Sequence, residues 1–289
     1  MTPGRPDAVF LLTDYGDGDE FAGVVRAVVL RHAPQAPIVD LTHGVPAFDV
    51  RAGALTLSRC VAYLGPGVVV AVVDPGVGSG RRAVAVRVRG VPGPHDSGPL
   101  HLVGPDNGLL GWAIDELGGA VAAVGLSGPG SAGGTFDGRD LFAPVAARLW
   151  SGATLEDVGI PLDPASLVRL APPKVAVSPV GSGSGPGTVE AEVQWIDRFG
   201  NAQLAARADD VARAGLSDPL EIRVATTTRR SRLVSSFAAL DADEVGLLLD
   251  ANGHLSVVCH RRPAATVLGV RLGDMVRVSR VPDPGEGAR

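Results

Sequence analysis

Residues 68–82 read VVVAVVDPGVGSGRR, and this stretch decides the fold class of the chain. The apolar run Val68–Val73 has the length of a buried strand, and Asp74–Pro75–Gly76 ends it with a turn. Outward from this run, further strand-like segments alternate with segments of helical spacing, such as those at 17–33 and 50–64. Strands separated by helices predict a layered α/β domain with a mostly parallel sheet.

The pattern changes after Leu170. A Pro-rich segment and the sequence VGSGSGPG at residues 180–187 are typical of a flexible linker. Short apolar runs separated by turns follow, from Val189–Ile196 to Met275–Val278. We therefore expect an α/β domain over residues 1–172, a linker over 173–187 and a smaller β-rich domain over 188–289.

Composition excludes several classes of protein. The net charge of −5 argues against a nucleic-acid partner, which would require a basic face. No apolar run approaches the roughly 20 residues of a membrane helix, and the N-terminus has no signal-peptide pattern, so we expect a cytoplasmic protein without membrane contact. Neither Cys60 nor Cys259 belongs to a Cys-x-x-Cys pair, and the six histidines lack metal-ligand spacing, so no metal site is expected.

Three acids share one sequence context. Asp14, Asp74 and Asp106 each follow a strand-like apolar run and open a turn. Each acid alone could simply form a turn or cap a helix. Because ligands bind at the carboxyl ends of strands in open α/β sheets, the three together favour an acid-lined site. Arg81 could pair with Asp74 across the loop, since a guanidinium binds a carboxylate through two hydrogen bonds.

Two further polar loops are candidates for function. In the segment TFDGRD (residues 135–140), we expect Asp140 to cap the helix that follows and Asp137 to be free for function. In WIDRFGN (residues 195–201), two aromatic side chains flank a polar turn, which suits either ligand stacking or a hydrophobic core. For His43, at the end of a predicted strand, a structural role is expected.

Taken in order, these motifs resemble the S-adenosylmethionine (SAM)-using hydroxide adenosyltransferases, which are related to fluorinating and chlorinating enzymes. The motifs are, in chain order, Thr13–Gly16, Asp40–His43, Phe48–Val50, Asp74–Ser79 with Arg81, Gly104–Leu110, Thr135–Asp140 and Asp197–Asn201. The ordered set spans nearly the whole chain. The resemblance implies an α/β domain, a C-terminal β-barrel-like domain and a homotrimer with active sites between subunits. It also implies hydrolysis of SAM to adenosine and L-methionine, with no cofactor.

The resemblance also implies roles for individual residues. Asp74 and Arg81 match two of the three water-activating residues of the family, and Asp137 stands where the family has a histidine. The implied substrate contacts are Asp14 to the ribose hydroxyls, Phe48 and Thr135 in the pocket, Asp197 to the methionine ammonium, Phe199 and Asn201 beside the adenine, and Phe237 closing the pocket.

Departures from the family pattern leave alternatives open. Two nearby carboxylates, Asp74 and Asp137, would repel each other unless Arg81 offsets the repulsion. The missing histidine suits a non-catalytic protein that binds SAM or adenosine, and the segments 250–253 and 259–262 also differ from the family.

A metal-dependent ribohydrolase is another alternative, because the acidic run at residues 14–20 could hold a hard cation. Halogenation is disfavoured, because the halogenating branch has other residues where this chain has Asp74, Val77 and Gly138.

Overall fold

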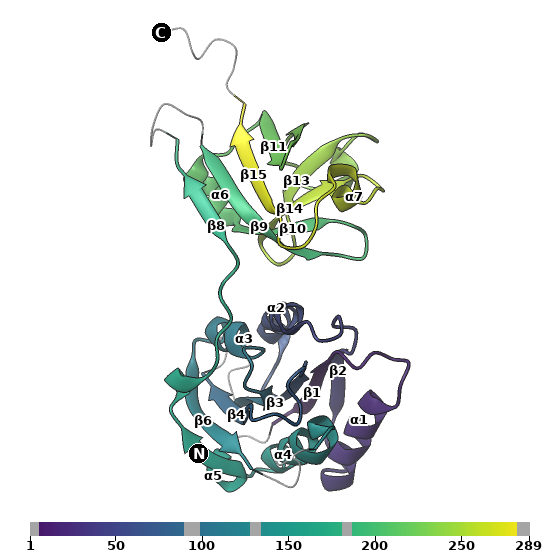
Figure 1. Ribbon diagram of the computed structural model, residues 1–289, viewed down its shortest axis with the longest axis vertical. Coiled ribbons are helices and arrows are strands. Elements are labelled where there is room, and N and C mark those ends of the chain that lie inside the picture. Colours follow the sequence, from purple (N-terminus) through teal and green to yellow (C-terminus); the bar gives the residue numbers. More distant parts are fainter. Residues whose placement is uncertain (1–5, 90–98, 128–133, 181–186, 282–289) are drawn as a thin grey trace. The chain divides into compact units, whose positions relative to one another are not determined.

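The computed structural model describes residues 6–89, 99–127, 134–180 and 187–281 (Figure 1). The chain divides into two compact units, Met1–Leu170 and Ala171–Arg289. The stretch 173–187, expected as a linker, contains strand β8 (Val175–Ser178), which pairs with β9 (Thr188–Ile196). Residues 181–186 of that stretch lie outside the described residues.

The first unit contains a seven-stranded sheet of order β2-β1-β3-β5-β4-β6-β7. Strands β2, β1, β3, β5 and β6 run in one direction, and β4 and β7 run in the other, which confirms the mostly parallel sheet. Strand β3 lies inside the sheet between β1 and β5, and its side chains are buried on both faces, which a continuous apolar run allows. The strands are β1 (Ala8–Thr13), β2 (Ile38–Thr42), β3 (Gly67–Val72), β4 (Ala83–Val88), β5 (Leu100–Pro105), β6 (Ala120–Leu126) and β7 (Gly159–Leu162).

Helices cover both faces of this sheet (Figure 1). Helix α1 (Phe21–His32) packs beside α4 (Ala143–Trp150) on one face, and α2 (Val50–Cys60) packs beside α3 (Gly111–Glu116) on the other. The Asp49 carboxylate caps α2 by accepting a hydrogen bond of 2.8 Å from the Ala52 amide. The remaining helical segments are the 3₁₀ turns Val61–Tyr63 and Pro164–Ser166, the π-helical turn Gly138–Phe142, and α5 (Leu155–Val158).

The second unit is an antiparallel sheet of order β12-β11-β15-β9-β10-β14-β13, with β8 also on β9. Backbone hydrogen bonds from Leu247 to Arg232 and from Val234 to Leu247 join its two ends, so the sheet is nearly closed, as the barrel-like prediction requires. Its elements are β10 (Ala202–Arg207), α6 (Ala208–Ala214), β11 (Leu220–Val224), β12 (Thr227–Ser231), a 3₁₀ turn (Phe237–Ala239), β13 (Val245–Leu249), β14 (His254–Cys259), α7 (Ala264–Leu268) and β15 (Met275–Arg280).

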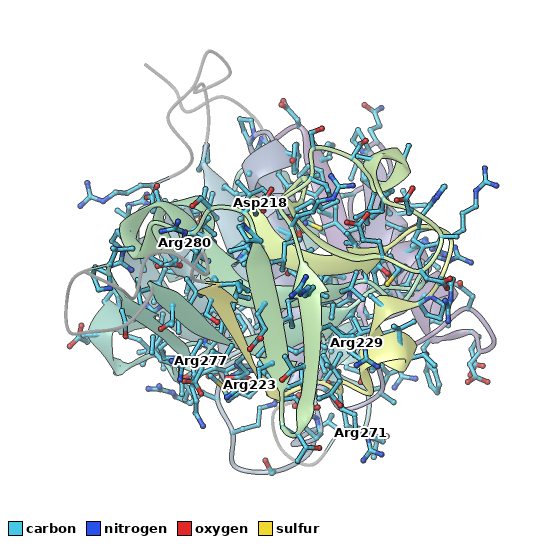
Figure 2. The ribbon with its side chains drawn as sticks, turned by 90° about the horizontal axis from the view of Figure 1, so that it is seen from above. Asp218, Arg223, Arg229, Arg271, Arg277 and Arg280 are labelled. Carbon is cyan, nitrogen blue, oxygen red and sulfur yellow. The ribbon has the colours of Figure 1, made fainter. Side chains whose placement is uncertain are left out.

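Side-chain alternation explains why this sheet curls around a core. Ile222 on β11 and Val278 on β15 are paired in register and buried, whereas the next pair, Arg223 and Arg277, is exposed (Figure 2). The edge strand β12 is largely polar and was not predicted from the sequence. Among the described residues, no helix is long and apolar enough to cross a membrane.

Candidate active site

The loop between β3 and β4 holds a charged cluster centred on Arg81. The Arg81 Nε lies 3.0 Å from each Asp74 carboxylate oxygen, and Nη2 donates to Oδ2 of both Asp74 and Asp137. The side chains are 13 % exposed for Arg81 and 5 % for each acid. Burial opposes the Arg81 charge, but the two carboxylates outweigh it and raise the Arg81 pKa. The predicted Asp74–Arg81 pair is confirmed, and Arg81 also bridges to Asp137.

Asp137 precedes the π-helical turn Gly138–Phe142, a distortion often found at functional sites. Its Oδ1 atom is buried and has no hydrogen-bond partner within the described part of the chain. A buried carboxylate oxygen of this kind is available to a ligand or a water molecule. The expectation for Asp140 was wrong: the helical backbone begins earlier, at Gly138, and Asp140 pairs with Arg139 instead of capping.

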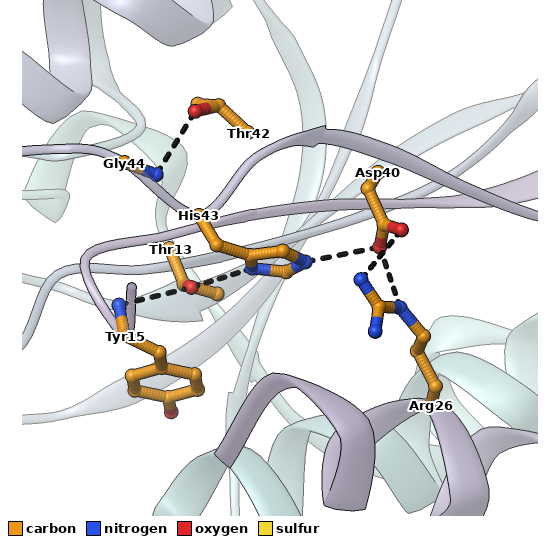
Figure 3. Close-up of polar contacts among 7 residues, drawn as sticks. All are labelled: Thr13, Tyr15, Arg26, Asp40, Thr42, His43 and Gly44. Atoms are coloured by element: carbon orange, nitrogen blue, oxygen red, sulfur yellow. Dashed lines mark hydrogen bonds and ion pairs between the residues drawn. The ribbon is translucent and has the colours of Figure 1, made fainter. Parts of the chain in front are cut away.

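A polar network centred on the buried Thr13 and His43 holds the turn that follows β1 (Figure 3). The Thr13 Oγ1 atom lies 2.8 Å from His43 Nδ1 and accepts a hydrogen bond from the Tyr15 amide. The His43 Nε2 atom lies 3.0 Å from Asp40, which in turn binds Arg26 through two hydrogen bonds. His43 is buried and hydrogen-bonded through both ring nitrogens, which confirms the predicted structural role.

The same turn presents Asp14 beside Phe48. The Asp14 Oδ2 atom accepts a hydrogen bond of 2.9 Å from the Phe48 amide. Phe48 has a φ of 66° and a side chain that is largely exposed. A non-glycine residue with positive φ is strained, and such strain persists where surrounding contacts hold it, often in ligand-binding segments.

A cavity of about 250 Å³ joins these features in the first unit. Five of the site residues predicted from the sequence line this cavity: Asp14, Phe48, Asp74, Thr135 and Asp137. Its other lining residues are Tyr15, Phe21, Ala47, Val72, Val77, Phe136 and Gly138. Arg81 does not line this cavity; it lines, with Asp137, a second cavity of about 270 Å³. The aromatic lining of Tyr15, Phe21 and Phe136 was not predicted from the sequence, although aromatic side chains are rare in this chain.

Asp106 does not line the cavity that contains Asp14 and Asp74, so the structure does not bring the three acids together as predicted. Its carboxylate accepts hydrogen bonds of 2.8 Å from Arg82 Nε and from the Val168 amide. These bonds anchor the segment around Val168 to the end of β5 and occupy both carboxylate oxygens. Asp106 therefore has a structural role.

The second unit has a cavity of about 340 Å³, lined by Phe199, Asn201, Phe237 and the segment Cys259 to Pro263. The structure thus brings together three of the four site residues predicted in this unit. The fourth, Asp197, is not part of the lining. Its Oδ1 accepts from the Phe199 and Asn201 amides, both at 2.9 Å, and its Oδ2 accepts from Asn201 Nδ2 at 2.8 Å.

The segment 250–253, which differs from the family pattern, has a local structural role for Asp250. The Asp250 carboxylate accepts hydrogen bonds from Gln203, from Ser256 Oγ and from the backbone amides of Asn252 and His254. Burial opposes its ionisation, but these hydrogen bonds lower the Asp250 pKa overall. Asp250 therefore braces the β13–β14 turn.

In the parts of the chain that the structure describes, no group of three or more His, Cys, Asp or Glu side chains is arranged to hold a metal ion.

Comparison with known proteins gives a consistent result over both units. Family models for the SAM hydroxide adenosyltransferase N-terminal and C-terminal domains match residues 9–159 and 191–277. The (R)-S-adenosyl-L-methionine hydrolases of Salinispora arenicola and Salinispora tropica are 44 % and 41 % identical to the chain, with 92 % of this chain and 95 % of each relative covered.

More distant relatives extend this result. A fluorinase of an Actinoplanes species is 27 % identical, with 96 % of this chain and 98 % of the fluorinase covered. A solved structure of an uncharacterized conserved protein from Thermotoga maritima superposes with a TM-score of 0.82 at 30 % identity, covering 94 % of this chain and 100 % of that chain.

Proposed function

The chain belongs to the SAM hydroxide adenosyltransferase family, and from this premise we propose that it hydrolyses SAM to adenosine and L-methionine. The observation that carries the proposal is the Arg81-bridged carboxylate pair, with Asp137 Oδ1 buried and without a partner among the described residues. Both carboxylates line a cavity that also contains Asp14.

The main task of the protein in this reaction is to position the substrate and one water molecule. Water attacks the ribose C5′ in line with the sulfonium, the C5′–S bond breaks, and its electron pair converts the sulfonium to a neutral thioether. No general acid is therefore needed for the leaving group. The site must hold one water molecule in line with the C5′–S bond, accept its proton and exclude other water.

We assign the proton-accepting role to Asp137. Arg81 occupies its Oδ2 and leaves Oδ1 for the attacking water. The guanidinium also lies 5.6 Å above the Phe142 ring, which fixes its position. Arg81 bridges Asp137 and Asp74 and offsets the repulsion between the two carboxylates. A bridging arginine is thus the physical reason that an acid can replace the histidine of the family.

The remaining assignments follow the resemblance and the two cavities. Asp14 has one oxygen held by the Phe48 amide, and its second oxygen is proposed to bind a ribose hydroxyl. Phe48 and Thr135 are proposed to complete the pocket of the first unit. In the second unit, we propose that Phe199 and Asn201 flank the adenine, that Phe237 closes the pocket and that Asp197 binds the methionine ammonium.

We also propose a homotrimer with active sites between subunits and a cytoplasmic enzyme that needs no cofactor. The resemblance supports the assembly, and the absence of a redox step in the chemistry supports the lack of a cofactor. Sedimentation of the purified chain measures its mass in solution, and a monomer would contradict the assembly.

The decisive experiment supplies separated (R) and (S) sulfonium epimers of SAM and follows adenosine and methionine by chromatography. We expect equimolar products from the (R) form, unaffected by a chelator, and no halogenated adenosine when chloride is added. Asp137→Asn should lower kcat by about 10² to 10⁴, because it removes the general base. The matched control Asp140→Asn, which alters an acid paired outside the cavity, should retain activity. Tight binding without products would overturn the proposal in favour of a non-catalytic binder.

A further inference from the structure

Tyr15 lines the first-unit cavity together with Asp74 and Asp137, and it has no role in the proposed hydrolysis so far. Its backbone is fixed by the hydrogen bond from its amide to Thr13 Oγ1 (Figure 3). Its ring packs against Phe21 and Phe136, with ring centroids 5.8 Å and 5.6 Å away. These contacts determine where the phenol points.

The Tyr15 hydroxyl lies against the backbone of Gly138. A Cβ atom added at Gly138 would overlap Tyr15 Oη and would lie 3.3 Å from its Cζ. Gly138 directly follows Asp137, and Tyr15 and Asp137 both line this cavity. The Asp137 Oδ1 atom has no partner in the described part of the chain. The glycine thus makes room for a polar group next to the proposed base.

Burial and four nearby charged side chains determine the pKa of the Tyr15 hydroxyl. Burial raises the Tyr15 pKa, and Asp14, Asp74 and Asp137 raise it further, while Arg81 opposes them. The phenol is therefore neutral across the working pH range, and its O–H group is available as a hydrogen-bond donor.

We propose that Tyr15 is a catalytic residue whose hydroxyl donates a hydrogen bond to the attacking water and, with Asp137 Oδ1, fixes that water in line with C5′. This inference rests on the proposed hydrolysis. The water gives one proton to Asp137 and keeps the other as the 5′-hydroxyl of adenosine. Its oxygen forms the new bond to C5′ while the C5′–S electron pair leaves on sulfur. Donation from Tyr15 occupies one water lone pair and leaves the other for C5′.

The first test is Tyr15→Phe, with Tyr63→Phe as its matched control. The chain has two tyrosines, and Tyr63 is 78 % exposed and does not line the cavity. Tyr15→Phe keeps the ring contacts with Phe21 and Phe136, so its melting temperature should match that of the control. We expect kcat to fall by about tenfold to a hundredfold, with KM within about twofold of the wild type.

The second test changes only the acidity of the phenol. Global incorporation of a ring-fluorinated tyrosine into the Tyr63→Phe chain labels Tyr15 alone, and ¹⁹F NMR reports its ionisation. An ionised phenol cannot donate, so kcat should fall with rising pH along the same titration curve. Unlabelled Tyr63→Phe should show no such fall over that range, nor should labelled Tyr15→Phe, which carries fluorine at Tyr63 alone.

The possible results separate the role of Tyr15 from the proposed function. Unchanged kcat in Tyr15→Phe, a raised KM with unchanged kcat, or full activity with the fluorinated phenol ionised would overturn the role of Tyr15 while leaving SAM hydrolysis intact. Inactivity of the wild-type chain toward SAM would instead overturn the proposed function itself. A fall in kcat that follows phenol ionisation supports the inference.

Discussion

Replacement of Arg81 by methionine tests whether one guanidinium holds the two acids of the site together. Methionine keeps an unbranched apolar stem but removes all the donors. In the wild type, Arg81 donates to both oxygens of Asp74 and to Asp137 Oδ2, and the two acid side chains are almost fully buried. The variant would leave two buried carboxylates facing each other.

The geometry gives the expected size of the effect. Both carboxylates accept from the same Nη2 atom, so the accepting oxygens lie within about two hydrogen-bond lengths, roughly 6 Å, of each other. At an effective dielectric constant of about 20, two unit charges at that distance repel by about 3 kcal/mol. With the loss of the charge-assisted hydrogen bonds, Arg81→Met should lower the free energy of unfolding by about 3–5 kcal/mol.

The free energy of unfolding of Arg81→Met should also depend on pH, and the direction follows from proton uptake by the two carboxylates. Taking up one proton relieves the repulsion in the folded variant, whereas the unfolded chain has no such repulsion and ionises both acids normally. The folded variant therefore binds more protons, and its free energy of unfolding falls as pH rises from about 5 to about 8. Urea unfolding at the two pH values measures this slope as the difference between Arg81→Met and the wild type, because His101 contributes equally to both proteins.

The neighbouring arginine provides a matched control. Arg82→Met breaks the pair between Arg82 and Asp106 on the same loop and leaves the Arg81 bridge in place. The reasoning is refuted if Arg81→Met loses no more stability than Arg82→Met and shows no additional dependence on pH.

Two further predictions concern stability. Burial, together with the charge of Arg87, lowers the His101 pKa to about 4. Neutral His101 therefore contributes its full stabilisation of the fold above about pH 6.5, and that stabilisation is lost as pH falls toward 4. His101→Leu should remove about 3 kcal/mol of that acid loss at pH 4, measured by urea unfolding, and an unchanged acid limb would contradict it. Gly200→Ala should lower the melting temperature and weaken SAM binding, because φ is 81° and the new Cβ would overlap Pro263. Gly253→Ala, with a φ of 74° but open space around it, should cost less, and equal losses would argue against the clash.

The sequence predicted those parts of the fold whose signal is local. The run Val68–Val73 reads as a strand because a parallel strand buried on both faces is continuously apolar. Strand β12 has a polar sequence because it lies at an edge, so its pairing with β11 depends on contacts that local sequence does not encode. The near-closure through Leu247 is likewise a long-range feature.

In the site, too, the features that depend on local sequence could be predicted, and those that depend on long-range contacts could not. The Asp74–Arg81 pair could be predicted because both residues belong to one short loop. Asp106 has the same sequence context as Asp74, yet Arg82 and a distant backbone amide occupy it, and only the tertiary structure distinguishes the two acids. The approach of the Tyr15 hydroxyl to Gly138 joins segments more than a hundred residues apart, so no spacing rule could find it.

The division of the chain into two compact units has a consequence for redesign and for evolution. The acids and the arginine proposed to act on water belong to the first unit, whereas the aromatic cavity proposed to contact the base belongs to the second. We therefore expect substitutions within residues 259–263 to alter nucleoside preference and to leave the proposed hydrolytic residues in place. Exchange of the nucleophile, by contrast, must be engineered around Asp137 and Gly138.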